Sequence, residues 1–299
     1  MTFSDLDFIP VTTEDAQLLC DYLRRANYEE SNHNVINLIQ WMDYYPLWKV
    51  VTTEYLLLLG VHKGKFFTYM PLCEPQHFDH AIAQAKAIFD RHGIPFEMSC
   101  FTENEKDRAL TLYPHLEAVM EREGSDYLYD RIKLETLSGK ALQKRRNHYN
   151  AFVRETLPFV STEPLSADNL EEVKAFLREW RIDGTDEYFH YEKEGTFRIL
   201  ELHDQLPYQS LVMRIHGTVK AFVIASQCTP RMIQINIEKA DPTIRGLYQA
   251  VEIALLKQQD SSITLVNREN DMGLESLRQA KKALDPIAMI DKYRIREPQ

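Results

Sequence analysis

The residues best suited to chemistry lie near the C-terminal end, where a predicted strand runs into a row of polar side chains. The apolar run 263–266 predicts a buried strand, and Asn267, Glu269 and Asp271 follow it. Active sites of open α/β sheets tend to lie at the carboxyl ends of strands. An amide or carboxylate there can orient an attacking amine or accept its proton. We therefore take Asn267 and Glu269 as candidate catalytic residues.

Arg268 and Asp271, from the same strand end, are candidate ligand-binding residues. The alternative for Asp271 is helix capping, because a helix is predicted to begin near Met272 and Asp is a favoured N-cap residue. Capping explains Asp271, but it explains neither Glu269 nor Arg268.

A second candidate lies one strand earlier. Residues 233–238 alternate apolar and polar side chains, which predicts a strand, and a helix is predicted to begin at Gly246. Free backbone N–H groups at such a turn suit a phosphate or an acyl oxyanion, so Arg245 and Gly246 are candidate ligand-binding residues. Acyl transfer needs a proton acceptor, and Glu238 could fill that role. The alternatives are a turn glycine at Gly246 and, for Glu238, a salt bridge with the neighbours of Lys239 or with the basic helix described next.

A basic helix is predicted to begin near Ser138 or Gly139 and to reach Glu155. Its five Lys or Arg against one Glu give a local charge of +4 in a chain of net charge −10. The candidate anion-binding residues are consecutive: Lys144, Arg145, Arg146, Asn147 and His148. Such a cluster suits the pyrophosphate of an acyl carrier, a lipid headgroup or the acceptor end of a tRNA. The alternative is a solvated or structurally paired helix.

Three runs of sequence resemble a known family. They are Ile237–Asp241, Ile244–Ala250 and Asn267–Glu275, and they resemble the C-terminal-domain family of bacterial phosphatidylglycerol lysyltransferases. The resemblance implies two lobes of the GCN5-related acetyltransferase (GNAT) fold, as in the Fem-type aminoacyl transferases, with the basic helix between them. It also implies an aminoacyl donor. Where family members have Ser-Tyr before the final proline, this chain has Ala283-Leu284. If that pair shapes the acceptor pocket, the substrate of this chain differs or its activity is lost.

The order of predicted elements fits an α/β fold of two tandem GNAT-like lobes, each a mixed β-sheet flanked by helices. Each half reads helix, helix, hairpin, then alternating helix and strand, with hairpins at 55–70 and 211–224. We expect an N-terminal lobe over 1–125, a linking segment over 126–160 and a C-terminal lobe over 161–299. A closing strand is predicted over 289–295.

Composition narrows the classes of function. The net charge of −10 argues against a general nucleic-acid coat and against passive docking on an anionic membrane. The four cysteines form no C-x-x-C pair and the histidines no metal-ligand spacing, so we propose no metal. With no signal peptide and no apolar run of about 20 residues, we expect a cytoplasmic protein without transmembrane association.

We therefore expect a transferase that moves an aminoacyl or acyl group to an amine or hydroxyl acceptor. The acceptor would be a small molecule, a lipid headgroup or a peptide. No cofactor is required, and aminoacyl-tRNA or acyl-CoA is the candidate donor substrate; Leu247 and Tyr248 crowd the turn and disfavour acyl-CoA. The alternatives are a non-catalytic module that binds a phosphorylated or anionic ligand between the lobes, and an acyl-CoA N-acetyltransferase.

Overall fold

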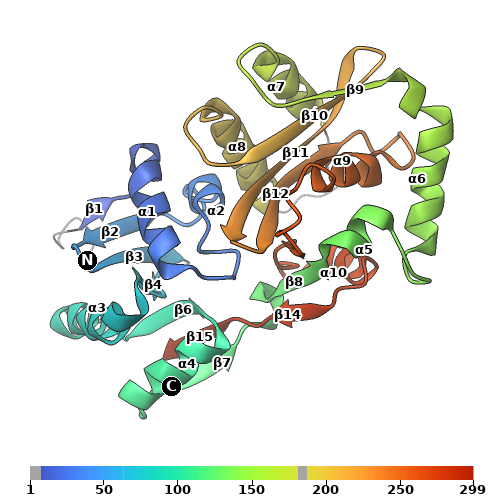
Figure 1. The fold of residues 1–299 in the computed structure, drawn as a ribbon. Helices are drawn as coiled ribbons and strands as arrows, with labels where there is room; N and C mark the ends of the chain where they lie inside the picture. Colours follow the sequence, from blue (N-terminus) through green and yellow to red (C-terminus); the bar gives the residue numbers. More distant parts are fainter. Residues whose placement is uncertain (1–7, 63, 181–186, 299) are drawn as a thin grey trace. The chain divides into compact units, whose positions relative to one another are not determined.

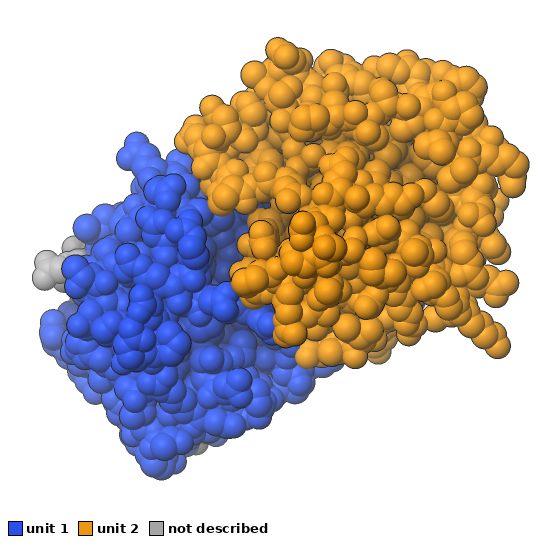
Figure 2. Space-filling view, in the orientation of Figure 1, with its two compact units in different colours: residues 1–125, 290–299 blue, residues 126–289 orange. Residues whose placement is uncertain are grey.

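The chain forms two compact units in a computed structural model, which describes residues 8–62, 64–180 and 187–298. Unit 1 comprises residues 1–125 and 290–299, and unit 2 comprises residues 126–289 (Figure 2). Each unit is a mixed β-sheet flanked by helices (Figure 1). The predicted α/β class with two sheet-and-helix lobes is confirmed.

The sheet of unit 1 has the strand order β1-β2-β3-β4-β6-β15-β7, with β5 paired to β3. Its strands are β1 (Ile9–Pro10), β2 (Leu47–Val51), β3 (Tyr55–His62), β4 (Lys65–Tyr69), β5 (Leu72–Cys73), β6 (Glu97–Phe101), β7 (Glu117–Met120) and β15 (Tyr293–Arg296). Its helices are α1 (Ala16–Ala26), α2 (Val35–Gln40), α3 (Phe78–His92) and α4 (Glu103–Leu112). The predicted hairpin is confirmed as β3 and β4, although Lys63 of its turn lies outside the described residues.

The returning C-terminal segment is anchored in unit 1 by a buried lysine. Lys292 is 1% exposed and its Nζ donates to Ser31 Oγ at 2.9 Å and to Asn32 Oδ1 at 2.6 Å, with Glu30 Oε2 3.7 Å away. The single closing strand predicted over 289–295 is wrong, because this anchor interrupts it. The segment forms β14 (Ala288–Ile290) beside β8 and then β15 between β6 and β7.

The sheet of unit 2 has the strand order β14-β8-β13-β12-β11-β10-β9. Its other strands are β8 (Asp126–Asp130), β9 (Val160–Glu163), β10 (Gln209–Ile215), β11 (Thr218–Thr229), β12 (Met232–Ala240) and β13 (Leu265–Asn267). Its helices are α5 (Arg131–Thr136), α6 (Gln143–Glu155), α7 (Leu170–Glu179), α8 (Glu187–Glu201), α9 (Leu247–Leu256) and α10 (Glu275–Lys282). The second predicted hairpin is present as β10 and β11.

The segment 126–160 folds as part of unit 2. Strand β8 pairs antiparallel with β13, and α6 lies beside α9 (Figure 1). Phe152 of α6 is 1% exposed and belongs to the core of this unit. The basic helix begins at Gln143, later than predicted, because Gly139 has a left-handed backbone with φ of 89°.

The close approach of α6 to the start of α9 requires a glycine. Gly246 has φ of 82°, a conformation that L side chains rarely adopt. A Cβ there would lie 2.8 Å from the carbonyl carbon of His148, closer still to its oxygen, and 3.0 Å from Cβ of Phe152. Gly246 therefore lets the backbone of α6 touch the first turn of α9.

Gly246→Ala should destabilise unit 2 more than the same substitution at a glycine that has positive φ but no close neighbours. Gly217 is the matched control, because its φ is 78° and nothing lies within 4 Å of a Cβ built on it. We expect Gly217→Ala to lower the free energy of unfolding by about 1 kcal/mol, from the left-handed backbone alone. Gly246→Ala should lower it by roughly a further 1–3 kcal/mol, from overpacking against α6. Urea denaturation of both variants measures the difference, and equal losses would contradict the contact.

Candidate functional site

One guanidinium group joins three elements of unit 2 at the point where two parallel strands stop pairing. Strands β12 and β13 pair only from Met232 to Gln234 and from Leu265 to Asn267. Arg268 follows β13, and its two terminal nitrogens donate to Glu238 of β12 and to Glu252 of α9. The side chains of Glu238 and Glu252 are 8% and 5% exposed, and that of Arg268 is 18% exposed. The cluster is thus nearly buried, and Arg268 retains some contact with solvent.

The surroundings of this cluster shift the pKa values of two ionisable groups toward neutral pH. Burial raises the pKa of Glu238 to about 7; Arg268 opposes this shift and the charge of Glu252 adds to it. Lys281 donates to the carbonyl oxygen of Arg268, and burial together with the Arg268 charge lowers the pKa of Lys281 to about 8. Groups with pKa values of this kind are suited to general acid–base chemistry.

Backbone contacts hold the cluster in place. The Tyr129 hydroxyl donates to the carbonyl oxygen of Lys281 at 2.8 Å, and the backbone N–H of Arg268 donates to the carbonyl oxygen of Tyr127 at 3.0 Å. The predicted partner of Glu238 was a neighbour of Lys239 or the basic helix. Its partner in the structure is Arg268, and Lys239 instead pairs with Glu192 of α8 at 2.7 Å.

Asn267 and Glu269 shape the loop that carries Arg268. Asn267 is fully buried; its amide donates to Asp126 Oδ2 at 3.1 Å, and its Oδ1 accepts from the backbone N–H of Glu269 at 2.7 Å. Glu269 has φ of 59°, and its Oε1 accepts from Gln234 Nε2 at 2.8 Å. Both side chains are therefore engaged in hydrogen bonds that position the loop.

Asp271 is held by a tyrosine and an arginine. Its Oδ2 accepts from the Tyr127 hydroxyl at 2.7 Å and from Arg278 Nε at 2.9 Å, and its Oδ1 accepts from Arg278 at 3.1 Å. Burial opposes ionisation, but the hydrogen bonds from Arg278 and Tyr127 outweigh it and lower the pKa of Asp271 to about 2. Asp271 is thus a buried, ionised anchor for the start of α10.

The helix predicted to begin near Met272 begins at Glu275 instead, so that prediction is wrong. Met272 and Gly273 have φ of 52° and 75°, which no right-handed helix contains. The backbone N–H of Met272 donates to Asn270 Oδ1, and that of Gly273 donates to Asp271 Oδ1, both at 3.0 Å. These two side chains cap a turn in place of a helix.

The structure divides the basic cluster of α6 into two groups. Arg145 donates to the carbonyl oxygens of Ala280 and Ala283 at 3.0 and 3.4 Å, at the C-terminal end of α10. Arg146 donates to the carbonyl oxygens of Leu137 and Gly139, just after α5. The contacts of these two arginines agree with the alternative interpretation, in which the basic residues of the helix are structurally paired.

The other group lies around His148. Burial lowers the pKa of His148, and the charges of Arg245, Lys144 and Arg145 lower it further. Lys144 and His148 are one helical turn apart, and Arg245 adjoins Gly246, which lies against the His148 backbone. Lys144 and Arg245 are exposed, as is Asn147. The structure therefore brings Lys144, His148 and Arg245 together.

Glu252 and Lys281 were missed from the sequence. Glu252 is the charged residue in the apolar helix LYQAVEIALL, and a carboxylate in such a helix is a usable signal of a buried ion pair. Lys281 carries no comparable signal, because α10 is rich in polar residues.

Neither a metal centre nor a membrane span stands out in the described parts of the chain. Over residues 8–62, 64–180 and 187–298, no three His, Cys, Asp or Glu side chains gather as metal ligands would. Within the same ranges, no helix has the length and hydropathy that crossing a membrane requires.

Comparison with known families gives one model that covers most of the chain. The family described as "Phosphatidylglycerol lysyltransferase, C-terminal" matches residues 24–296. An uncharacterised protein of Mycoplasmoides gallisepticum is 27% identical over 183 residues, which are 60% of this chain. The match spans 58% of that curated relative's length.

Several solved structures share the fold. A conserved protein of unknown function from Bacteroides thetaiotaomicron is 22% identical with a TM-score of 0.87, covering 98% of this chain and 99% of that one. L-PGS from Bacillus licheniformis is 17% identical with a TM-score of 0.66, covering 95% and 92%. FemX is 8% identical with a TM-score of 0.58, covering 97% of each chain. The two-lobed fold that the resemblance implied, shared with L-PGS and FemX, is confirmed.

The depressed pKa of Asp271 predicts acid sensitivity. Because it lies near 2 in the folded state and near 3.8 otherwise, the stabilisation is present above pH 4 and is lost as pH falls through 2. The full loss is about 2 kcal/mol, with about half of it reached by pH 3. Urea denaturation at pH 6 and pH 3 should show a smaller acid loss in Asp271→Asn than in wild type. The exposed Glu275→Gln is the control, and an unchanged acid loss in Asp271→Asn would contradict the assignment.

Proposed function

The chain belongs to the phosphatidylglycerol lysyltransferase C-terminal family, and we propose that it transfers an aminoacyl group from a carrier to an amine or hydroxyl acceptor. The family and the two-lobed fold make the chain acyl- or aminoacyl-transferase-like. The proposal of aminoacyl transfer rests on the position of Glu238, a carboxylate with a pKa of about 7 that one arginine holds in place.

Glu238 acts as the general base in this proposal. The acceptor nitrogen or oxygen attacks the carbonyl carbon of the aminoacyl ester, and Glu238 takes the proton that the acceptor loses. The bond between the carbonyl carbon and the carrier oxygen then breaks, and the protonated Glu238 returns its proton to that oxygen. Arg268 holds the carboxylate, while burial, with a smaller contribution from the charge of Glu252, keeps Glu238 basic enough for the first step.

An aminoacyl ester suits this chain better than acyl-CoA. An anion seated on the first turn of α9 would meet the His148 backbone, which lies against Gly246. That carbonyl oxygen repels a pyrophosphate. Lys144 and Arg245 are exposed around His148, and their charges favour a polyanionic carrier such as aminoacyl-tRNA.

A non-catalytic module that binds an anionic ligand is the second candidate. The observation that favours it is the mutual pairing of Glu238, Arg268 and Glu252, which also describes a purely structural ion cluster. The two candidates differ in one measurable respect, because only the transferase consumes its donor.

Glu238→Gln should strongly slow donor consumption without unfolding the chain. The assay follows loss of label from a pool of aminoacyl-tRNAs charged with radioactive amino acids, with labelled acetyl-CoA in parallel and with amines and anionic phospholipid vesicles as acceptors. We expect wild type to consume an aminoacyl-tRNA, at a rate that rises with pH to a plateau and has a midpoint near 7, since the base must be ionised. Glu238→Gln should be slower by a factor of about 100 or more.

Glu201→Gln is the matched control, because Glu201 is an exposed glutamate of α8 in the same unit, and it should keep the wild-type rate. If neither donor is consumed at any pH while wild type still binds tRNA, the binding module is the correct interpretation. Consumption of acetyl-CoA alone would reverse the preference for an aminoacyl donor.

A further inference from the structure

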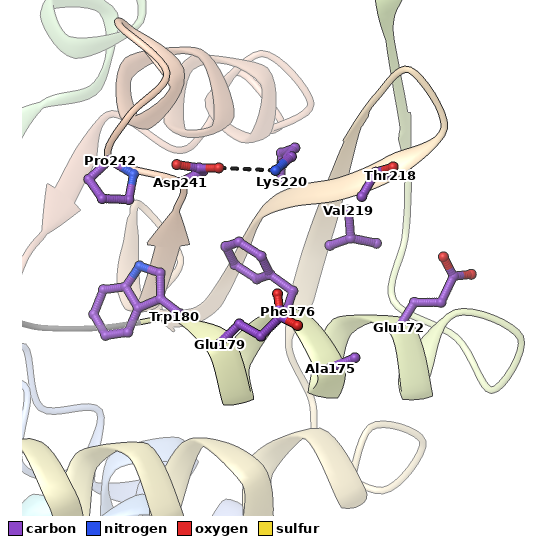
Figure 3. A pocket seen from close by; sticks show the side chains of 10 residues that line it. All are labelled: Glu172, Ala175, Phe176, Glu179, Trp180, Thr218, Val219, Lys220, Asp241 and Pro242. Atoms are coloured by element: carbon purple, nitrogen blue, oxygen red, sulfur yellow. Dashed lines mark hydrogen bonds and ion pairs between the residues drawn. The ribbon is translucent and has the colours of Figure 1, made fainter.

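A pocket of about 460 Å³ lies in unit 2 between α7 and the start of β11 (Figure 3). Its apolar lining includes Phe176 and Val219, with Trp180 at one end beside Pro242. Its charged lining consists of Glu172, Glu179, Lys220 and Asp241. The volume is within the range of small-molecule sites.

The pocket and the Glu238 cluster lie on opposite faces of the sheet. Along β12, Glu238 points toward Arg268 and α9, whereas Lys239 points toward α8 and α7, where it pairs with Glu192. Side chains alternate between the faces of a strand, so Asp241, two residues after Lys239, belongs to the face of α7. The pocket is therefore distinct from the proposed transfer site.

Most of the charge around the pocket is already paired. Glu172 accepts from Arg214 at 2.6 and 2.9 Å, and Asp241 accepts from Lys220 at 3.1 Å. The side chain of Glu179 is exposed, and its carboxylate makes no hydrogen bond or ion pair within the parts of the chain that the structure describes. One uncompensated carboxylate thus remains beside an aromatic wall (Figure 3).

The aromatic wall is fixed and attractive to cations. Trp180 donates its indole N–H to the carbonyl oxygen of Ala240 at 3.0 Å. The ammonium of Lys239 lies 4.1 Å from the centroid of the Trp180 ring, so this ring already interacts with one cation. Phe176 packs edge-on against Phe222 of β11 at 6.2 Å and is held in the pocket.

We propose that this pocket binds the primary ammonium group of a small alkylamine. The ammonium donates hydrogen bonds to the Glu179 carboxylate, and the alkyl stem packs on Phe176 and Trp180. A single positive charge complements the single unpaired carboxylate, and an N–H donor makes the charge-assisted bond that a quaternary ammonium lacks. The proposal is independent of the transfer reaction, because it uses the other face of the sheet.

Titration of the full chain with n-pentylamine tests the site. Protein labelled with ¹⁵N-tryptophan gives an indole N–H signal for Trp180, which Trp180→Phe assigns among the three tryptophans. We expect a saturable shift of this signal with n-pentylamine, and binding at least about tenfold weaker for n-pentanol and for pentanoate at the same ionic strength.

Glu179→Gln should weaken n-pentylamine binding about tenfold or more. Glu171→Gln is the matched control, because Glu171 lies on α7 outside the pocket and pairs with Lys174, so it should bind as wild type does. Equal binding of n-pentanol, unchanged binding in Glu179→Gln, or an equal loss in Glu171→Gln would each overturn the proposal. Absence of a saturable shift would overturn it as well.

Discussion

The fold of unit 2 depends on one guanidinium shared between two buried carboxylates. Arg268 holds Glu238 of β12 and Glu252 of α9, while its backbone bonds to Tyr127 of β8 and to the side chain of Lys281 of α10. Four elements meet at one residue for this reason. Removing it would leave two carboxylates facing each other out of water, which costs several kcal/mol. Burial of Glu238, to which the charge of Glu252 adds, is what raises its pKa.

Helix α6 supports the same region through contacts that its amino-acid composition does not indicate. Its cations look like a ligand patch in the sequence, yet Arg145 and Arg146 bind carbonyl oxygens at the ends of α10 and α5. Cations are favourable at helix C-termini because of the helix dipole. The backbone of His148 lies against the first turn of α9, where Gly246 admits it, and Lys144 and Arg245 are close enough to affect the pKa of His148. One helix thus combines two arginines that pair with backbone carbonyl oxygens and an exposed lysine, Lys144.

Local pattern was enough to predict the hairpins, the strand that carries Glu238 and the turn at Gly246, because each depends on neighbours in the sequence. It also marked Glu238 and Arg268 as separate candidates. Local pattern could not show that Glu238 and Arg268 form an ion pair, because the two residues meet only when β12 and β13 come together. The predicted helix start near Met272 is wrong because Met272 and Gly273 have positive φ, which delays the start of the helix. No residue pattern indicates these φ values. Glu252 was hidden in an apolar helix.

The role of Glu238 is tested most directly by its pKa, measured by ¹³C NMR on protein with labelled glutamate side chains and assigned with Glu238→Gln. We predict a midpoint of about 7 in wild type. We also predict a lower midpoint in Glu252→Gln, because that substitution removes the negative charge that competes for Arg268. A wild-type midpoint near the ordinary glutamate value of about 4.3 would contradict this role. Glu238 would then be a simple ion-pair partner of Arg268 without a basic role.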